Sequence, residues 1–416
     1  MSRAHRSDLH PDVAHSPEPP AQSTTRSTSP AYPAGSSATA TLVVTALLVL
    51  TQLYAAIPLL APISADLHGN ATIALSTAFS LTYAAGFLIW GPVSDHYGRR
   101  RIMALALGIL IASTVCCALA PSLPVLAALR AIQGLSASGF APVALAYLSE
   151  ALEPPRRAGA IGAMSTSFLV AGIVGQVLAS LVALHLGWRW FFPLCSGLLA
   201  VALTVVLAVV HDAAPASGPS GSSLRGQFAS LGRLAVRPAV LALSLAHVTL
   251  LMVFVAMYTG IGGHLETLGM RPSTVILIRL AALPAMFLSL IAGRIAARWS
   301  WARTARLGFG VSALGMLGEA LLAGSLAGLV ACSVVYVAGV ALAAPAMISL
   351  YGQVSAPNRG SGMALNGFIL FVGTSAGPLL ATSSSTFWVL ALTLTGVLAV
   401  ALLAVTGFKA LADADH

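Results

Sequence analysis

Long apolar runs constrain this chain more than any other feature of its sequence. A helix needs about 20 apolar residues to cross the roughly 30 Å hydrocarbon core of a bilayer. Twelve runs reach that length, and they are continuously apolar instead of alternating, which excludes a closed β-barrel. The sequence therefore predicts an all-α integral membrane protein with twelve transmembrane helices. Their expected bounds are roughly residues 40–63, 73–92, 102–120, 124–147, 158–184, 190–210, 238–262, 274–297, 304–324, 329–352, 362–382 and 385–407.

The composition excludes an ordinary soluble protein. Hydrophobic residues make up 57% of the 416 residues and charged residues 8%, whereas soluble domains carry about 25% charged residues. The net charge is +9, but the basic residues are scattered, so we expect a lipid bilayer and no nucleic acid as partner. The four cysteines lie inside apolar runs without metal-ligand spacing, so we expect them to pack and expect no metal site.

Basic residues divide unevenly between the two sides of the predicted helices. If the N-terminus is cytoplasmic, seventeen Arg and Lys residues fall on the cytoplasmic side and only Arg189 and Arg271 on the other. This positive-inside bias predicts that both termini are cytoplasmic. We therefore expect a multi-pass protein of the plasma membrane, which in a bacterium is the inner membrane.

Composition also indicates the domain boundaries. Residues 1–38 are rich in Ser, Pro, Ala and Thr and cannot bury a core, so we expect a disordered cytoplasmic tail. Residues 212–237 are expected to form a cytoplasmic linker between two six-helix bundles, residues 39–211 and residues 238–408. Residues 409–416 are expected to form a short cytoplasmic C-terminal tail.

The two predicted bundles resemble each other in sequence. A shift of 202 residues aligns several landmarks of the first bundle with the second, each in the corresponding loop or span. Internal repeats of this kind are typical of secondary transporters, whose substrate site lies at the repeat interface near the bilayer midplane. We therefore expect two pseudo-symmetric bundles. The aligned pairs are Gly91 and Gly293, Arg101 and Arg303, Pro155 and Pro357, Arg157 and Arg359, and Gly175 and Gly377.

Three local motifs suggest a family. Residues 91–101 read G-P-V-S-D-H-Y-G-R-R-R, which resembles the G-x-x-x-D-x-x-G-R-R signature of the major facilitator superfamily. Residues 130–134 read R-A-I-Q-G, similar to the R-x-x-Q-G motif of that family, and G-W-R-W-F-F at residues 187–192 is also typical of it. The resemblance covers the transmembrane part from end to end. It implies a carrier in which two bundles rock around a central cavity.

The first of these motifs supplies candidates for a conformational latch. Asp95 is placed to accept hydrogen bonds from a helix N-terminus and from Arg99, while Gly98 permits a tight turn. In the family the neighbouring helix is span 11, so the resemblance implies a latch between the halves. The alternative is that the arginines only orient the loop. The predicted latch residues are Gly91, Asp95, Gly98, Arg99 and Arg100.

Polar residues inside the spans are costly and therefore informative. Arg130 either reaches back to the interface or faces a cavity, and the family motif implies a role in proton or anion handling. A free imidazole titrates near neutral pH, so His247 is expected to be either a proton carrier or substrate contact, or a packing residue. The predicted proton and substrate pathway consists of Arg130, Gln133, Gln176, His247, Tyr258 and Asn366.

Two further sets of residues are expected to hold the helices together. Arg279 and Glu319 lie at similar depth in spans joined by a short loop, so we predict a buried structural ion pair. Small residues spaced by four allow close helix contact, and a proline loosens the helix that carries it. The predicted helix-packing residues are Gly175 in span 5 and Gly373, Gly377 and Pro378 in span 11.

Other sequence motifs indicate which functions to expect. The chain lacks the G-x-x-x-x-G-K-[ST] loop of ATP-driven pumps, and its G-x-S-x-G match at residues 373–377 lies inside a predicted helix. We therefore expect no ATP, no cofactor and no enzymatic activity. Residues 171–180 match the G-x-x-x-G-P-x-x-G-G stretch of the family's drug–proton antiporters only in part.

We predict proton-coupled efflux of small, partly hydrophobic compounds by a monomer of this drug–proton-antiporter-like branch. The alternatives are proton-coupled uptake or exchange of a sugar or an organic anion, and a sensor that does not transport.

Overall fold

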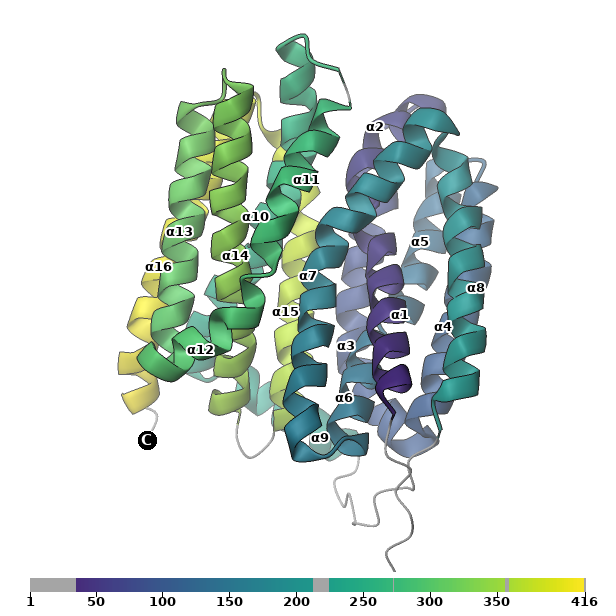
Figure 1. The fold of residues 1–416 in the computed structure, drawn as a ribbon, viewed down its shortest axis with the longest axis vertical. Coiled ribbons are helices and arrows are strands. Elements are labelled where there is room, and N and C mark those ends of the chain that lie inside the picture. Colours follow the sequence, from purple (N-terminus) through teal and green to yellow (C-terminus); the bar gives the residue numbers. More distant parts are fainter. Residues whose placement is uncertain (1–34, 212–223, 272, 356–358, 415–416) are drawn as a thin grey trace, which may run out of the picture. The chain divides into compact units, whose positions relative to one another are not determined.

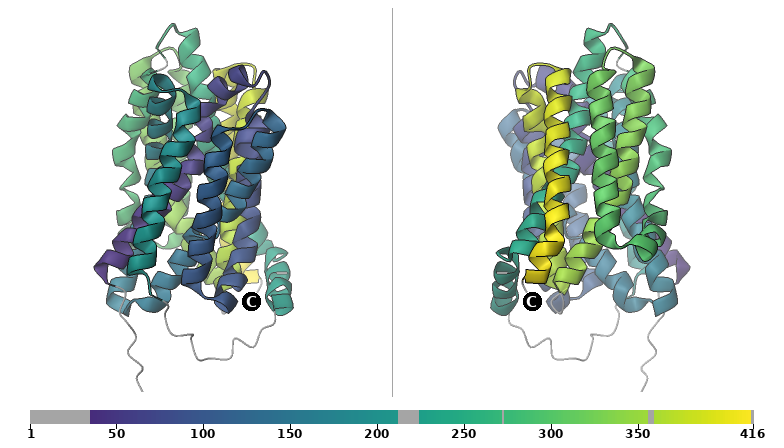
Figure 2. Two further views of the ribbon diagram at one scale, coloured as in Figure 1. Left: turned by 90° about the vertical axis from the view of Figure 1, so that its right-hand side faces the viewer. Right: turned by 90° about the vertical axis from the view of Figure 1, so that its left-hand side faces the viewer.

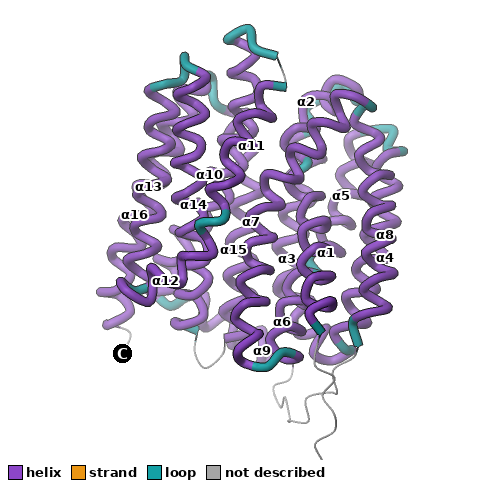
Figure 3. Tube along the Cα trace, in the orientation of Figure 1, coloured by secondary structure: helices purple, strands orange, loops and turns teal. Residues whose placement is uncertain are grey.

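The computed structural model describes residues 35–211, 224–271, 273–355 and 359–414. This part of the chain consists of helices and short turns, without a β-strand (Figure 3). Most of the predicted N-terminal tail and residues 212–223 of the predicted linker lie outside the described residues. The rest of the linker contains a helix, α9, and the last helix continues to Ala414, well into the predicted C-terminal tail.

The helices follow the order of the predicted spans. The first half contains α1 (Ser36–Tyr54), α2 (Ala56–Asp66), the π-helical turn η1 (Ile73–Thr77), α3 (Ala78–Tyr97), α4 (Arg99–Ala118), α5 (Leu123–Ala137), α6 (Ala141–Ala151), α7 (Pro154–His185), the 3₁₀ turn η2 (Trp188–Trp190) and α8 (Phe191–Val209). After α9 (Leu224–Ala235), the second half contains α10 (Pro238–Thr267), α11 (Thr274–Met286), α12 (Ser289–Trp299), α13 (Trp301–Leu321), α14 (Leu326–Val354), α15 (Arg359–Ser383) and α16 (Phe387–Ala414).

Each predicted span corresponds to one of these helices or to two consecutive ones. By length and composition, ten helical segments of the described residues are able to cross a membrane, and the pair α11 and α12, bent by 41°, makes an eleventh. The remaining predicted span, residues 304–324, is α13, which has 21 residues but carries Arg303, Arg306 and Glu319. The predicted all-α, multi-pass membrane fold is confirmed.

The bend between α11 and α12 has a local cause. The N–H groups of Phe287 and Leu288 donate to carbonyls three residues back, at Pro284 and Ala285, instead of four residues back. Such bonds tighten a helix and change its direction. The corresponding helix of the first half, α3, is unbroken.

The predicted repeat is visible in the helix boundaries. Helices α1 and α10 begin 202 positions apart, and so do α4 and α13. The turns before α4 and α13 also match, because Gly98 has a φ angle of 94° and Ser300, at the equivalent position, has a φ angle of 104°. Two copies of one helical framework therefore make up the described part of the chain.

The helices run between two ends of the bundle (Figure 1). Helix α1 begins and α16 ends at one end, which we call the terminal end; the turns that follow α4, α10 and α13 lie at the other, the distal end (Figures 1 and 2). The main contacts between the halves are made by α3 with α15 and by α7 with α11. In the repeat, α11 is the equivalent of α3 and α15 is the equivalent of α7. The contact of α3 with α15 is therefore related to the contact of α7 with α11 by the pseudo-symmetry.

Candidate functional site

An aromatic seam joins the halves along α3 and α15. The ring of Phe371 on α15 lies 4.5 Å from Tyr83 and 5.3 Å from Phe87, both on α3, between ring centroids. Gly367 lies against the ring of Phe87 so closely that a Cβ atom there would clash with it. Towards the distal end, the hydroxyl of Thr77 donates to the backbone oxygen of Ser375 at 3.3 Å. The seam therefore closes a long stretch of the interface.

A second aromatic contact joins α1, α7 and α10. Tyr54 on α1 meets Phe254 on α10 edge to face at 5.9 Å, and Phe254 meets Tyr258 at 5.0 Å. Gly172 on α7 faces the same ring, since a Cβ atom there would lie 3.2 Å from Phe254. The interface between the two repeats is therefore lined largely by aromatic side chains.

Several buried polar atoms near this interface have no hydrogen-bond partner. They include the hydroxyls of Tyr83 and Tyr258, Oε1 of Gln176 and Nδ1 of His247. Leaving a buried polar group unpaired costs free energy, so native proteins pair nearly all of them with protein, water or ligand. Water or the polar groups of a ligand are the partners that such atoms take.

Arg130 is buried in the first half and is held by neutral groups. Its Nε donates to the backbone oxygen of Leu75 at 2.8 Å and its Nη2 to that of Gln52 at 3.0 Å. Its Nη1 donates to Oε1 of Gln133 at 2.9 Å, and its guanidinium lies 4.3 Å over the ring of Phe79. No carboxylate pairs with it among the described residues. The side chain of Arg130 therefore does not reach back to the membrane–water interface.

Gln133 is fixed by the neighbouring helix α4. Its Nε2 donates to the hydroxyl of Thr114 at 2.7 Å, and its Oε1 also accepts from the thiol of Cys117 at 3.2 Å. The predicted pathway residues Arg130 and Gln133 are thus in direct contact. Sequence reasoning did not find Thr114, Cys117 or Phe79, because each lies on another element and none carries a charge.

His247 and Asn366, two other predicted pathway residues, also lie together. The amide of Asn366 on α15 donates to Nε2 of His247 on α10 at 2.9 Å, so the ring proton is on Nδ1. The ring of Tyr351 on α14 lies 5.3 Å from the imidazole, and its hydroxyl is 2.8 Å from Ser244. Tyr351 and Ser244 were not among the sequence candidates, since their positions in α14 and α10 resemble packing positions.

The structure does not form the predicted ion pair between Arg279 and Glu319. Nη1 of Arg279 donates to the hydroxyl of Ser180 on α7 at 2.6 Å, across the two halves. Oε1 of Glu319 accepts from Ser333 on α14 at 2.7 Å, and Oε2 has no partner. Similar depth in the bilayer does not determine which way two side chains face, so the sequence predicted the depth of these residues but not their partners.

The predicted helix-packing glycines lie at close helix contacts. A Cβ atom at Gly175 on α7 would lie 3.0 Å from the Cα of Thr51 on α1. At Gly373 and Gly377 on α15 it would clash with the backbone of α10, at Val248 and Met252. Pro378 lies inside α15, which continues to Ser383. Gln176, on the turn next to Gly175, donates from Nε2 to the backbone oxygen of Gly172.

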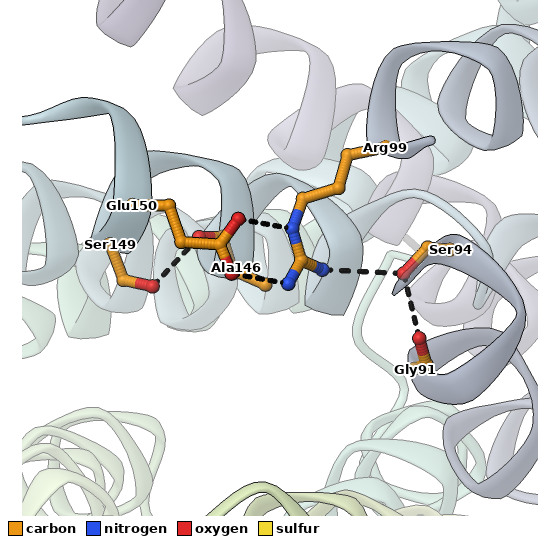
Figure 4. A network of polar contacts seen from close by, with 6 residues as sticks. All are labelled: Gly91, Ser94, Arg99, Ala146, Ser149 and Glu150. Atoms are coloured by element: carbon orange, nitrogen blue, oxygen red, sulfur yellow. Dashed lines mark hydrogen bonds and ion pairs between the residues drawn. The ribbon is translucent and has the colours of Figure 1, made fainter. Parts of the chain in front are cut away.

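The predicted latch residues lie at the terminal end, where α3, α4 and α6 meet (Figure 4). Nε of Arg99 donates to Glu150 at 2.7 Å, and Nη1 donates to Ser94, whose hydroxyl donates to the backbone oxygen of Gly91 (Figure 4). These contacts hold helices of the first half to one another. Nη2 of Arg100 donates to the backbone oxygen of Leu207 on α8 at 2.7 Å. The side chain of Asp95 lies outside the described residues, so the latch between the halves stays a prediction.

An apolar groove lies between α7 and α11, next to the contact of Arg279 with Ser180. Its volume is about 190 Å³, and its walls carry aliphatic side chains of both halves. The lining residues are Ile173, Val174, Val177, Leu178, Leu181, Leu280 and Leu283.

Comparison with known proteins points to one family. Residues 42–378 match the family model described as Major Facilitator Superfamily. The uncharacterized MFS-type transporter YybF of Bacillus subtilis is 32% identical over 142 residues, which are 33% of this chain and 34% of YybF. Multidrug resistance protein 3 of the same organism is 28% identical over 131 residues, 31% of this chain and 26% of that protein. The chain thus aligns with about a third or less of the length of these relatives.

The fold is similar to that of solved transporters. A bacterial homologue of the human lysosomal transporter Spinster, in an inward-facing and unoccupied conformation, has a TM-score of 0.69 at 15% identity. That match covers 90% of this chain and 96% of the homologue. The family model, the repeat and the helix order agree, and the chain belongs to the major facilitator superfamily.

Proposed function

We propose that the chain is a secondary active transporter that exports small, partly hydrophobic compounds in exchange for protons. The observation that carries the proposal is the interface between the repeats, where buried polar atoms without partners lie among aromatic rings. A small molecule with an apolar body and a few polar groups would satisfy both kinds of surface. Such a compound belongs to the substrate class of a drug–proton antiporter.

Alternating access follows from the pseudo-symmetry. The α3–α15 and α7–α11 contacts are equivalent, so two related interfaces hold the halves together. Rocking one half against the other would open the site to one end and then to the other. The close contacts at Gly373 and Gly377 keep α10 and α15 together during that motion.

The orientation of the chain belongs to the same proposal. The positive-inside bias places the terminal end in the cytoplasm and the distal end outside, in a plasma membrane. Residues 1–38 and residues 212–237 would then be a cytoplasmic tail and a cytoplasmic linker. We expect a monomer that is driven by the proton gradient and not by ATP.

A second candidate function is the transport of an organic anion. The observation that favours it is the buried guanidinium of Arg130, which contacts neutral acceptors and an aromatic ring. An anionic group of a substrate would be a stronger partner for it than a backbone carbonyl is. In this case Arg130 would bind the carboxylate or phosphate of an amphiphile.

Purified protein in proteoliposomes tests the proposal. Susceptibility profiling of a deletion strain first identifies compounds, and counterflow then measures transport while an internal pH dye reports protons. We expect substrate-dependent proton movement, and we expect Tyr54→Ala to lose transport at least tenfold because its ring lies at the interface. Tyr97→Ala is the matched control, since Tyr97 is 62% exposed. Accumulation instead of loss of the compounds in overexpressing cells would contradict efflux.

A further inference from the structure

Glu319 is a carboxyl group with an unused oxygen inside the second half. It lies near the distal end of α13 and is completely buried. Oε1 accepts one hydrogen bond, from Ser333, and Oε2 has no partner. An ionised carboxylate needs more than one hydrogen bond or a cation when it is buried. The geometry therefore fits a carboxyl group that holds a proton on Oε2.

Two tyrosine side chains of neighbouring helices interact with Glu319. The hydroxyls of Tyr258 on α10 and Tyr336 on α14 are buried without partners. Glu319 interacts electrostatically with both of them and with Cys332. Two further titratable side chains lie at this end of α10: His264 contacts the backbone oxygen of Ala323 at 2.8 Å, about one turn beyond Glu319, and Glu266 is exposed.

Arg279 lies on the other side of Tyr258. Its guanidinium is 5.9 Å from the centre of that ring, and it interacts electrostatically with the phenol. In this structure Nη1 donates to Ser180 of the other half, and Nε has no partner. Tyr258 therefore interacts with both buried charges, while the hydrogen-bond partner of Arg279 in this structure is Ser180 of the other half.

We propose that Glu319 binds the exchanged proton and that Arg279 moves between Ser180 and Glu319 according to whether this proton is bound. The proposal rests on the proposed proton-coupled function and names the residues that perform the coupling. The proton adds to Oε2 and leaves from it, and no other covalent bond changes. When it is bound, Arg279 holds α11 to α7 near the distal end through Ser180, which is the contact present in this structure.

Loss of the proton from Oε2 to the terminal side reverses this arrangement. The carboxylate then attracts Arg279, the bond to Ser180 breaks, and the apolar groove between α7 and α11 gives the helices room to separate. The distal end opens, substrate leaves, and a proton from that side reaches Glu319. Binding of this proton closes the distal end again, so substrate and proton move in opposite directions.

The test measures the distal end directly and needs no substrate. Spin labels are placed at Leu186 and Leu268, the exposed residues that follow α7 and α10, in a variant whose native cysteines are replaced. We expect the longer distance to gain about fivefold in population between pH 5.5 and 8.5. Glu319→Gln should keep the short distance at both pH values, and Arg279→Gln and Ser180→Ala should each remove the pH response.

The matched control is Glu266→Gln, because Glu266 is exposed at the same end of α10. It should respond to pH as the unchanged protein does. A Glu319→Gln variant that keeps the full pH response would overturn the proposal. Proton flux in proteoliposomes distinguishes a failure of this proposal from a failure of the proposed function. If the distance depends on pH but substrate does not cause proton flux, the proposed exchange is contradicted and the movement of Arg279 is not.

Discussion

The two halves share one framework but bury opposite charges at the same helix junction. In the first half, α4 and α5 enclose Arg130 next to Cys117; in the second, α13 and α14 enclose Glu319 next to Cys332. The repeat aligns Arg130 with Cys332 and Cys117 with Glu319, since each pair is 202 positions apart. Each half therefore has a cysteine where the other has a charged residue.

The surroundings of the two charges differ in one important respect. Three nitrogens of Arg130 have acceptors, and these tie α1, η1 and α5 together. Glu319 has one donor and an unused oxygen, and its neighbours Tyr258 and Tyr336 have unpaired hydroxyls. A satisfied buried network fixes a structure, whereas unpaired groups leave it free to change. We infer that the junction around Arg130 is the more rigid of the two and that the junction around Glu319 contains moving parts.

Arg130→Ala should have the largest effect on this comparison. The substitution removes three hydrogen bonds, takes the arginine donor away from the backbone oxygens of Leu75 and Gln52 and leaves a cavity. We expect it to lower the free energy of unfolding by about 3–5 kcal/mol. Cys332→Ala, at the equivalent position, should cost about 1 kcal/mol or less. Thermal unfolding in detergent compares the two variants. Similar losses of stability would mean that the junctions do not differ in rigidity.

The close helix contacts offer a second test. Gly373→Ala should destabilise the second half by about 1–3 kcal/mol, because its Cβ atom would meet the backbone oxygen of Val248. The first half has Ala171 at the equivalent position, so α7 accommodates a methyl group there while it packs on α1. Gly91→Ala is the control, since no atom lies within 4 Å of the added methyl group. A neutral Gly373→Ala would show that α10 and α15 separate easily, which would be seen in the same unfolding experiment.

The turns before α4 and α13 give a smaller effect of predictable sign. Both have a positive φ angle, which glycine adopts freely and serine adopts only with strain. Ser300→Gly should therefore stabilise the chain by about 1 kcal/mol, and Gly98→Ser should destabilise it by a similar amount. The Oγ of Ser300 accepts a hydrogen bond of 3.4 Å from the N–H of Arg303. The loss of this long hydrogen bond in Ser300→Gly cancels little of the expected stabilisation. Melting temperatures that move in the same direction for both variants would contradict the strain argument.

Much of the fold could be predicted because its signals are local in the sequence. Runs of apolar residues determine the spans, and the repeat follows from spacing alone. The contact of Arg130 with Gln133 was also accessible, because residues three apart share a helix face. The partners Ser180 of Arg279 and Ser333 of Glu319 were not, because each is a neutral serine on another helix. Helical periodicity says which residues share a face, but not which face meets which neighbour.

The ion pair of Arg99 with Glu150 gives the smallest expected effect and a further contrast between the halves. The second half has Trp301 and Gly352 at the equivalent positions and so has no such pair. The side chain of Glu150 is 49% exposed, so water and salt screen the attraction, and Glu150→Gln should cost about 0.2–1 kcal/mol. That cost should fall further in high salt, which thermal unfolding at two ionic strengths would measure. A larger loss of stability that salt does not change would mean that the ion pair fixes α4 to α6. The terminal end of the first half would then be rigid because of an ion pair that the second half lacks.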